Sequence, residues 1–233
     1  MTGSTITPVW SNPSFIAERG LVHSLSGIFS VLDVEGTQRW VDIGCGTRPY
    51  EGFFPAGAYT GIDVPASGRP DALKKPDILY DGHILPFASS ALDGILCTQV
   101  LEHVRVPDTL LDECWRVLKP GASLILSAPF VWQEHEQPFD FFRFTSFGMS
   151  EMLQRHGFEC VMSAKSSGSL ETLAQLASTY LTNNIRVPIA GFGRALTLFA
   201  CCPIQIAGML LQKVLPDQSE LFLDMVVLAS KKA

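Results

Sequence analysis

A glycine turn flanked by acidic residues is the first feature of this sequence that could do chemistry. Residues 40–43 read as a buried strand that runs straight into Gly44-Cys45-Gly46, and Asp42 stands just before the glycines. Glycine permits a sharp turn and lets the backbone approach a ligand closely. The third glycine of a dinucleotide fingerprint is missing, which argues against a pyrophosphate ligand. A carboxylate at Asp42 suits an ammonium group instead.

Two more acidic residues follow the next two predicted strands. Asp63, followed by Val64, lies at the separation from the glycines at which a carboxylate accepts both ribose hydroxyls. Asp81-Gly82 comes later, where Asp81 can accept from an adenine amino group while Leu85 packs on the ring. A ligand with a cation, a ribose and no phosphate fits S-adenosylmethionine (SAM) better than a nicotinamide dinucleotide. Simpler interpretations stay open, since glycines serve turns, Asp63 can cap a helix and Asp81-Gly82 is an ordinary turn pair.

A loop rich in aromatic residues, 129–145, could supply the acceptor side of a site. It places His135, Asp140 and Arg143 among aromatic residues such as Trp132, an unfavourable mixture unless the polar groups are paired. We predict that His135 is a general base if the acceptor is a hydroxyl, and that Trp132, Asp140 and Arg143 bind substrate. The alternative is a structural ion pair between Asp140 and Arg143, with His135 bracing the loop.

Short apolar runs alternate with helical segments, as in a parallel sheet built from βαβ units. The spacing predicts one or two helices over 14–32 and later helices over 108–118 and 146–156. The predicted strands are 40–43, 59–63, 78–80, 94–97, 123–128, 158–162 and 221–229. The carboxyl ends of such strands form the ligand-binding edge of an open sheet, which would gather the glycines, the acids and the aromatic loop.

Six motifs stand in order along the chain: D-I-G-C-G (42–46), G-I-D-V (61–64), L-P-F (85–87), L-D-G-I-L (92–96), L-E-H-V (101–104) and R-V-L-K-P-G (116–121). Together they resemble the class I SAM-dependent methyltransferases that act on small molecules. The resemblance implies an α/β, Rossmann-like three-layer sandwich with a seven-stranded, mostly parallel sheet, an antiparallel last strand and, in this chain, a helical insertion before it. It implies that these residues bind the cofactor: Asp42, Gly44, Cys45, Gly46, Asp63, Val64, Asp81, Gly82, Leu85 and Gln99.

His103 is the second candidate catalytic residue, because Glu102-His103 follows the fourth predicted strand near the expected methyl group. Some related quinone O-methyltransferases hold a divalent metal here. We predict no metal, since Gln99 stands where that pattern has an acid and a hard cation needs several oxygen ligands. His103 could also be only a helix-start residue bonded to backbone. The run from His135 to Thr145, H-x-x-P-x-D-x-x-R-x-T, resembles bacterial methyltransferases often associated with cell-surface glycans.

Composition limits the partners. The 233 residues carry a formal net charge of −6 without a basic run, which argues against nucleic acid. The six cysteines are scattered and no secretory signal is visible, so we expect reduced thiols in a cytoplasmic protein. The expected partner is a small-molecule, glycan or lipid-like acceptor, methylated on oxygen. A silent SAM-binding protein and, less favoured, a nicotinamide-dependent oxidoreductase are the alternatives.

The chain is predicted to form one methyltransferase domain with four parts: an N-terminal helical arm (1–36), the SAM-binding core (37–168), an apolar helical insertion (169–219) and a closing strand (220–233). Within the insertion, residues 187–212 contain one charged residue, Arg194. We expect Pro203 to kink or end a helix, giving two helices that cover the substrate side or form a dimer face. Peripheral membrane contact is the second interpretation, and a membrane-spanning helix the third.

Overall fold

The structure, a computed structural model, describes residues 7–65, 67–68, 74–184 and 192–232. Its centre is a seven-stranded sheet in the order β3-β2-β1-β4-β5-β7-β6. The strands are β1 (Trp40–Ile43), β2 (Tyr59–Asp63), β3 (Ile78–Leu79), β4 (Leu92–Thr98), β5 (Leu118–Pro129), β6 (Phe158–Lys165) and β7 (Asp224–Lys231). Strand β7 runs antiparallel to both of its neighbours, while β1 to β5 are parallel. The predicted fold class is confirmed.

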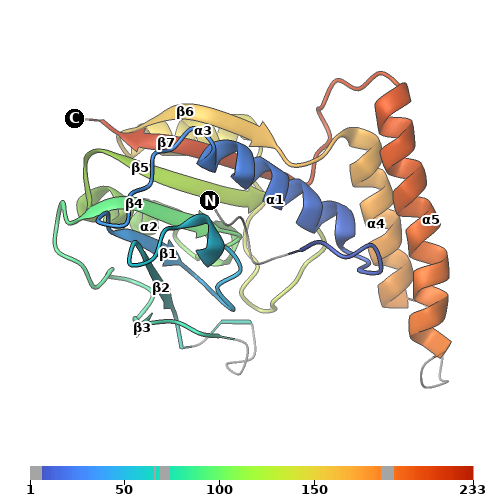
Figure 1. Cartoon of the computed structure of the whole chain (residues 1–233), viewed down its shortest axis with the longest axis horizontal. Helices are drawn as coiled ribbons and strands as arrows, with labels where there is room; N and C mark the ends of the chain where they lie inside the picture. The colour runs from blue at the N-terminus through green and yellow to red at the C-terminus, as the bar shows by residue number, and fades with distance from the viewer. Residues whose placement is uncertain (1–6, 66, 69–73, 185–191, 233) are drawn as a thin grey trace.

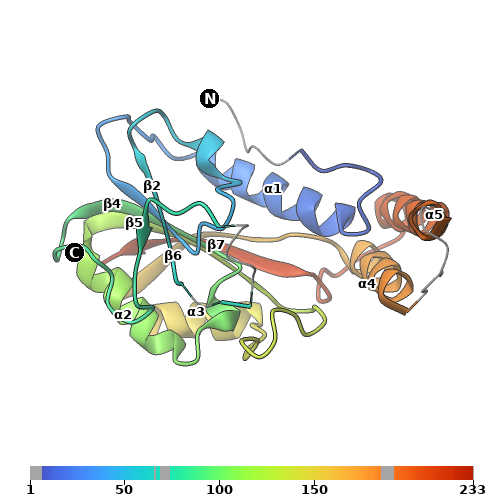
Figure 2. The ribbon, with the colours of Figure 1, turned by 90° about the horizontal axis from the view of Figure 1, so that it is seen from below.

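Helices cover both faces of the sheet, so its strands are apolar on both sides. Helix α1 (Phe15–Phe29) lies on one face, and α2 (Pro107–Val117) and α3 (Ser146–Arg155) lie on the other (Figure 2). Alternate residues of β5 serve the two layers: Ile125 packs with the α1 layer and Leu124 with the α2 and α3 layer. The two buried clusters stabilise the sheet from both sides and hold its strand ends in place.

The connection from β1 to β2 has no α-helix. After the glycine turn it forms only η1, a short 3₁₀ helix (Glu51–Phe53). Phe53 stacks on Phe29 of α1 with ring centroids 4.6 Å apart. This aromatic contact covers the sheet in place of a crossover helix. The short connection leaves the carboxyl end of β1 close to the loops that follow β2 and β4.

Two long helices, α4 (Ser169–Asn184) and α5 (Phe192–Val214), stand side by side beyond the end of the sheet (Figure 1). They approach closely at Gly208, where an added Cβ would lie 2.3 Å from the Cβ of Ala174. An ion pair from Arg19 of α1 to Glu171 of α4 anchors the pair to the rest of the chain. Pro203 was expected to kink or end a helix; an end there is wrong, because Pro203 lies inside the continuous helix α5, and a kink stays a prediction. Packing against α4 holds α5 helical across the proline.

Several apolar side chains of the two helices are exposed, among them Tyr180, Phe199, Leu210 and Val214. Within the described ranges no helix is long and apolar enough to cross a membrane. Residues 187–191 of the predicted apolar stretch lie outside the described residues. Contact with a membrane surface or a second copy of the chain stays a prediction, as does the four-part division. All six cysteines are free.

Candidate active site

The glycine turn after β1 is built by backbone contacts that need glycine. Gly44 has a φ of +69°, and an added Cβ there would lie 2.4 Å from the Cγ2 of Val100. The amide groups of Gly44 and Cys45 both donate to the carbonyl of Ile62 in β2, over 2.9 and 3.1 Å. The amide of Gly46 donates to Oδ2 of Asp63 over 3.1 Å. The turn therefore brings the first two predicted motifs into contact.

Asp42 lies under this turn and is 1% exposed. Its Oδ2 accepts a hydrogen bond of 2.5 Å from the hydroxyl of Tyr59, whereas its Oδ1 has no partner within the described part of the chain. Burial raises the pKa of Asp42 to about 7, although the Tyr59 bond opposes that shift. A buried carboxylate oxygen without a partner is costly, and a cation or a bridging donor would offset that cost.

A cavity of about 600 Å³ lies at the carboxyl ends of β1, β2 and β4. That size is typical of small-molecule sites. The predicted site residues that line it are Gly44, Asp63, Val64, Asp81, Gly82, Gln99 and His103. Four predicted cofactor residues do not line it: Asp42, Cys45, Gly46 and Leu85. Leu85 is 1% exposed in the core, so in this structure its side chain faces no ligand.

The two acids that line the cavity are held by backbone amides. Asp63 accepts from the amide of Val64 over 2.8 Å through one oxygen and from Gly46 through the other. Asp81 accepts through Oδ1 from the amides of His83 and Ile84, and these bonds lower its pKa. Asp81 thus forms the turn of the simpler interpretation and still lines the cavity. Each carboxylate oxygen has two acceptor positions, so both acids keep capacity for a ligand.

Gln99 marks the end of β4 with a φ of +55°. Its side-chain amide donates to Oγ of Ser127 over 3.2 Å. A hydrogen bond from Gln99 also lowers the pKa of Asp224, although burial dominates and raises that pKa to about 6. Gln99 therefore connects the cavity wall to a buried acid at the start of β7.

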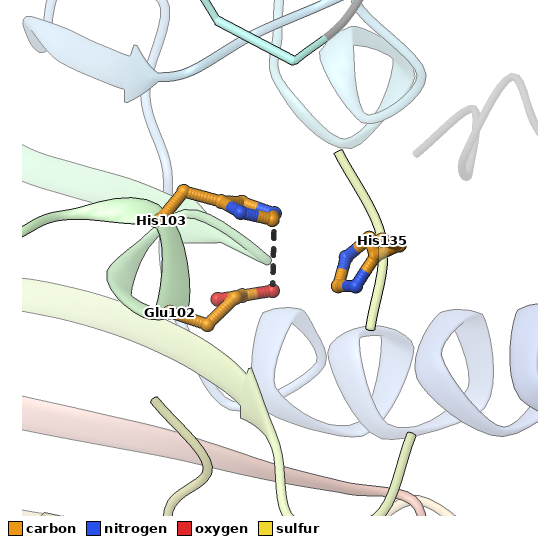
Figure 3. A group of neighbouring side chains, drawn as sticks. All are labelled: Glu102, His103 and His135. Atoms are coloured by element: carbon orange, nitrogen blue, oxygen red, sulfur yellow. Dashed lines mark ion pairs between the residues drawn. The ribbon is translucent and has the colours of Figure 1, made fainter. Parts of the chain in front are cut away.

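Glu102, His103 and His135 gather beside the cavity (Figure 3). The first two lie in η3 (Leu101–His103), the short 3₁₀ helix after β4, and His135 comes from the aromatic loop. The loop docks on η3 because the amide of Phe141 donates to the carbonyl of Glu102 over 2.8 Å. The two imidazole rings meet edge to face with centroids 4.7 Å apart. Residues far apart in the sequence therefore meet beside the cavity, which only His103 of the three lines.

Most polar atoms of this cluster have no hydrogen-bond partner among the described residues: Glu102 Oε1, Glu102 Oε2, His103 Nε2 and His135 Nδ1. Glu102 is fully buried, and burial raises its pKa to about 8. His103 Nδ1 lies 2.7 Å from the carbonyl of Phe139, so this nitrogen donates and Nε2 keeps its lone pair. Burial lowers the pKa of His103, which favours the neutral ring.

The aromatic loop is held together by Arg143. Its guanidinium pairs with both oxygens of Asp140, at 2.6 and 2.7 Å, and also donates to the carbonyls of Trp132, Gln133 and Phe142. The Arg143 pair holds the pKa of Asp140 far below its ordinary range. These bonds use all five donors of the guanidinium, so Arg143 has none left for a substrate.

The other residues predicted on the acceptor side lie behind the cavity wall. Trp132 packs against the cluster formed by Phe15, Ile16 and Met209. His135 is not among the cavity-lining residues, and its amide donates to Asp140. Of the two predicted catalytic histidines, only His103 lines the cavity. Glu102 was not among the predicted catalytic residues; its signal was its position beside His103 in the L-E-H-V motif, and it lies next to the cavity without lining it.

Comparison with known proteins agrees with this geometry. The methyltransferase domain family matches residues 41–126. Thiol S-methyltransferase TMT1B of Rattus norvegicus is 29% identical over 46% of this chain and 48% of its own. The ubiquinone biosynthesis O-methyltransferase of Dechloromonas aromatica is 31% identical over 39% of this chain and 44% of its own. The matched regions thus span less than half of these relatives.

A solved structure shares the fold. Phosphoethanolamine N-methyltransferase 2 of Haemonchus contortus, in complex with SAM, superposes with a TM-score of 0.56 over 93% of this chain and 53% of that chain. Its sequence identity is 14%, so the likeness shows the fold alone.

Proposed function

The chain contains a class I SAM-dependent methyltransferase domain, and on that premise we propose that it transfers a methyl group from SAM to a hydroxyl of a small-molecule acceptor. One observation carries the proposal: a single cavity is lined by Gly44 of the glycine turn, by Asp63 and Asp81, and by His103. The first three suit an adenosyl ligand, and the last suits an acceptor that must lose a proton.

The residues fit SAM in three places. The unpartnered Oδ1 of Asp42, under the glycine turn, would attract the ammonium group through a bridging donor. Asp63 would accept from the ribose hydroxyls, and Asp81 from the adenine amino group. Bound there, SAM supplies a methyl group on a sulfonium, which accepts a nucleophile's electron pair as the carbon–sulfur bond breaks.

The chain's own contribution is alignment and exclusion of water. The backbone of Gly68, in the loop after β2, lies against Glu136 so tightly that an added Cβ would be 2.1 Å from the Glu136 carbonyl. This contact joins two loops whose residues Ser67 and Glu136 line the cavity. Val104, Val106 and Phe139 give the cavity apolar walls, which suit an acceptor with an apolar body. We therefore favour a phenol or a similarly apolar alcohol.

The proton of the acceptor hydroxyl leaves toward the cluster of Glu102, His103 and His135. His103 lines the cavity; its Nε2 is the unprotonated nitrogen, and its Nδ1 is fixed by Phe139. The oxygen–carbon bond forms as the carbon–sulfur bond breaks, and the hydroxyl proton is released to the cluster. The general-base role predicted for His135 stays a prediction.

The first test is calorimetric titration of the chain with SAM, its demethylated product and NAD. We expect SAM and the product to bind and NAD not to bind. Asp63→Asn should weaken SAM binding about 10- to 100-fold, because hydrogen bonds to a charged group contribute about 1.5–3 kcal/mol. Asp112→Asn changes an exposed acid of α2 and is the matched control. Equal SAM affinity in both variants would contradict the assignment of Asp63.

The second test is transfer of labelled methyl from SAM to a phenol, an aliphatic alcohol and a small thiol. Transfer to a hydroxyl supports the proposal, and transfer to the thiol alone would reassign the acceptor to sulfur. SAM binding without transfer to any acceptor supports the silent-binder alternative. His103→Ala should lower turnover while SAM affinity stays unchanged.

A further inference from the structure

The cluster of Glu102, His103 and His135 has a gap at its centre. One potential ligand atom from each residue lies within 4.8 Å of those of the other two. Glu102 Oε1 and His103 Nε2 are 3.8 Å apart, too far for a hydrogen bond. Figure 3 shows the Glu102 carboxylate and the His103 ring facing each other, with His135 beside them. The side chains surround a space without bonding across it.

The burial of Glu102 makes this gap costly. Its side chain is 0% exposed, and neither oxygen has a hydrogen-bond partner among the described residues. A buried carboxylate normally has several partners or coordinates a metal ion. No Lys or Arg forms an ion pair with Glu102 in the described part of the chain. A ligand with positive charge or donors would satisfy both oxygens.

The spacing fits an ion. Zinc lies about 2.0–2.2 Å from His nitrogen and carboxylate oxygen, so tetrahedral ligands stand about 3.3–3.6 Å apart. Small side-chain rotations would close the present separations to that value. His103 already has the second contact typical of a metal-bound imidazole, because its Nδ1 donates to the carbonyl of Phe139. The carboxylate of Asp140 lies 3.2 Å from Nδ1 of His135 without forming a hydrogen bond, and a rotation of the ring would let it orient His135.

The donor set selects the kind of metal. Two imidazoles and one carboxylate suit zinc or another late first-row transition ion, whereas magnesium and calcium prefer sites made of oxygen. The expectation of no metal concerned an oxygen-rich site, which would need an acidic residue at the position where this chain has Gln99. A nitrogen-rich site does not depend on that acid, because His135 supplies the third ligand from another loop.

We propose that Glu102, His103 and His135 bind one zinc-like transition-metal ion, with an open coordination position toward the cofactor cavity. Three protein ligands leave such a position in catalytic zinc sites. Glu136 indicates which side of the ion faces the cavity. It lines the cavity, and its Oε2 lies 3.9 Å from the Nε2 of His103. For its consequence the proposal rests on the proposed function: the acceptor oxygen would bind the ion, which lowers the pKa of the hydroxyl and aligns it with the methyl group. Nε2 of His103 would then be a ligand and not a base, so the hydroxyl proton would leave to water.

The test is titration of the chelator-treated full chain with Co²⁺, followed by visible absorption. Low-coordinate Co²⁺ absorbs far more strongly than the hydrated ion, so the readout needs neither SAM nor turnover. We expect one equivalent to bind with a low-coordinate spectrum and Zn²⁺ to displace it. Glu102→Gln, His103→Gln and His135→Gln should each weaken binding at least about 100-fold, since even loss of an outer contact costs 10- to 100-fold. His23→Gln changes an exposed histidine of α1 and should bind as the wild type does.

Each outcome decides the proposal. A hydrated-ion spectrum in the wild type would overturn it and leave water as the occupant of the gap. Unchanged Co²⁺ affinity in Glu102→Gln would also overturn it. Glu102→Gln keeps the shape of the side chain and removes a buried charge, so thermal unfolding of the metal-free variant verifies that it folds. Calorimetry of SAM binding to the metal-free chain tests the proposed function separately. Failure of the metal proposal is therefore distinguished from failure of the proposed function.

Discussion

Replacing Asp42 by asparagine should change how the stability of the protein depends on pH. Asp42 is fully buried, and burial raises its pKa from an ordinary 3.8 to about 7. Between these values the folded chain keeps the proton that the unfolded chain loses. The free energy of unfolding therefore falls as pH rises from about 4 to about 7, and is level above that range. The D42N variant lacks this ionisation and should lack the part of the fall that comes from Asp42.

The size of the effect follows from the shift. Each pKa unit corresponds to about 1.4 kcal/mol, so ionisation of Asp42 costs the wild type about 3 kcal/mol between about pH 5 and pH 8. Asparagine can still accept from the hydroxyl of Tyr59, but it buries an amide group without a partner. That penalty does not change with pH. The difference in stability between variant and wild type should move by about 3 kcal/mol in favour of the variant over this range.

Urea unfolding of both proteins at about pH 5 and pH 8 measures this difference, and taking the difference removes the contributions of other buried acids. Asp33→Asn, at an exposed position, is the matched control and should give the same difference at both pH values. A difference for D42N that does not change with pH would refute the burial argument. The same variant should bind SAM more weakly at pH 8, because the negative charge that favours the ammonium group is gone.

Two other substitutions test the turn and the aromatic loop. Gly44→Ala should cost about 1–3 kcal/mol in stability, because its φ of +69° and the nearby Cγ2 of Val100 both exclude a Cβ. In urea unfolding, adding Val100→Ala to Gly44→Ala should recover part of this loss. No recovery would contradict the contact between Gly44 and Val100. Arg143→Gln should cost at least about 2 kcal/mol because it leaves Asp140 without its charged partner, while calorimetry should find SAM affinity unchanged. If Arg143→Gln left stability unchanged and abolished only methyl transfer, this structural role would be contradicted and Arg143 would be assigned to substrate binding.

The parts of the site that sequence could predict are those with a local signal. A strand that runs into glycines gives the turn at Gly44, and acids placed after the next strands give Asp63 and Asp81, all of which line the cavity. Leu85 could not be assigned a face, because the side on which a loop residue packs depends on tertiary contacts. Its amide bonds to Glu113 of α2 and its side chain joins the core.

The acceptor side was harder to predict because irregular loops have no periodicity. Arg143 looked available in sequence, yet its donors are all taken by Asp140 and by carbonyls that the folded loop brings within reach. The proximity of Glu102 to His135 needs the loop to dock on η3, which no local pattern encodes. The helix end expected at Pro203 does not occur for the same reason, since contacts with α4 outweigh the helix-breaking preference of proline.

A crystal structure of the chain with the demethylated cofactor would test the central claim most directly. We expect the ribose to lie on Asp63, the adenine beside Asp81, and the sulfur to face His103. A cofactor bound elsewhere on the molecule, or with its sulfur turned away from Glu102 and His103, would contradict the account.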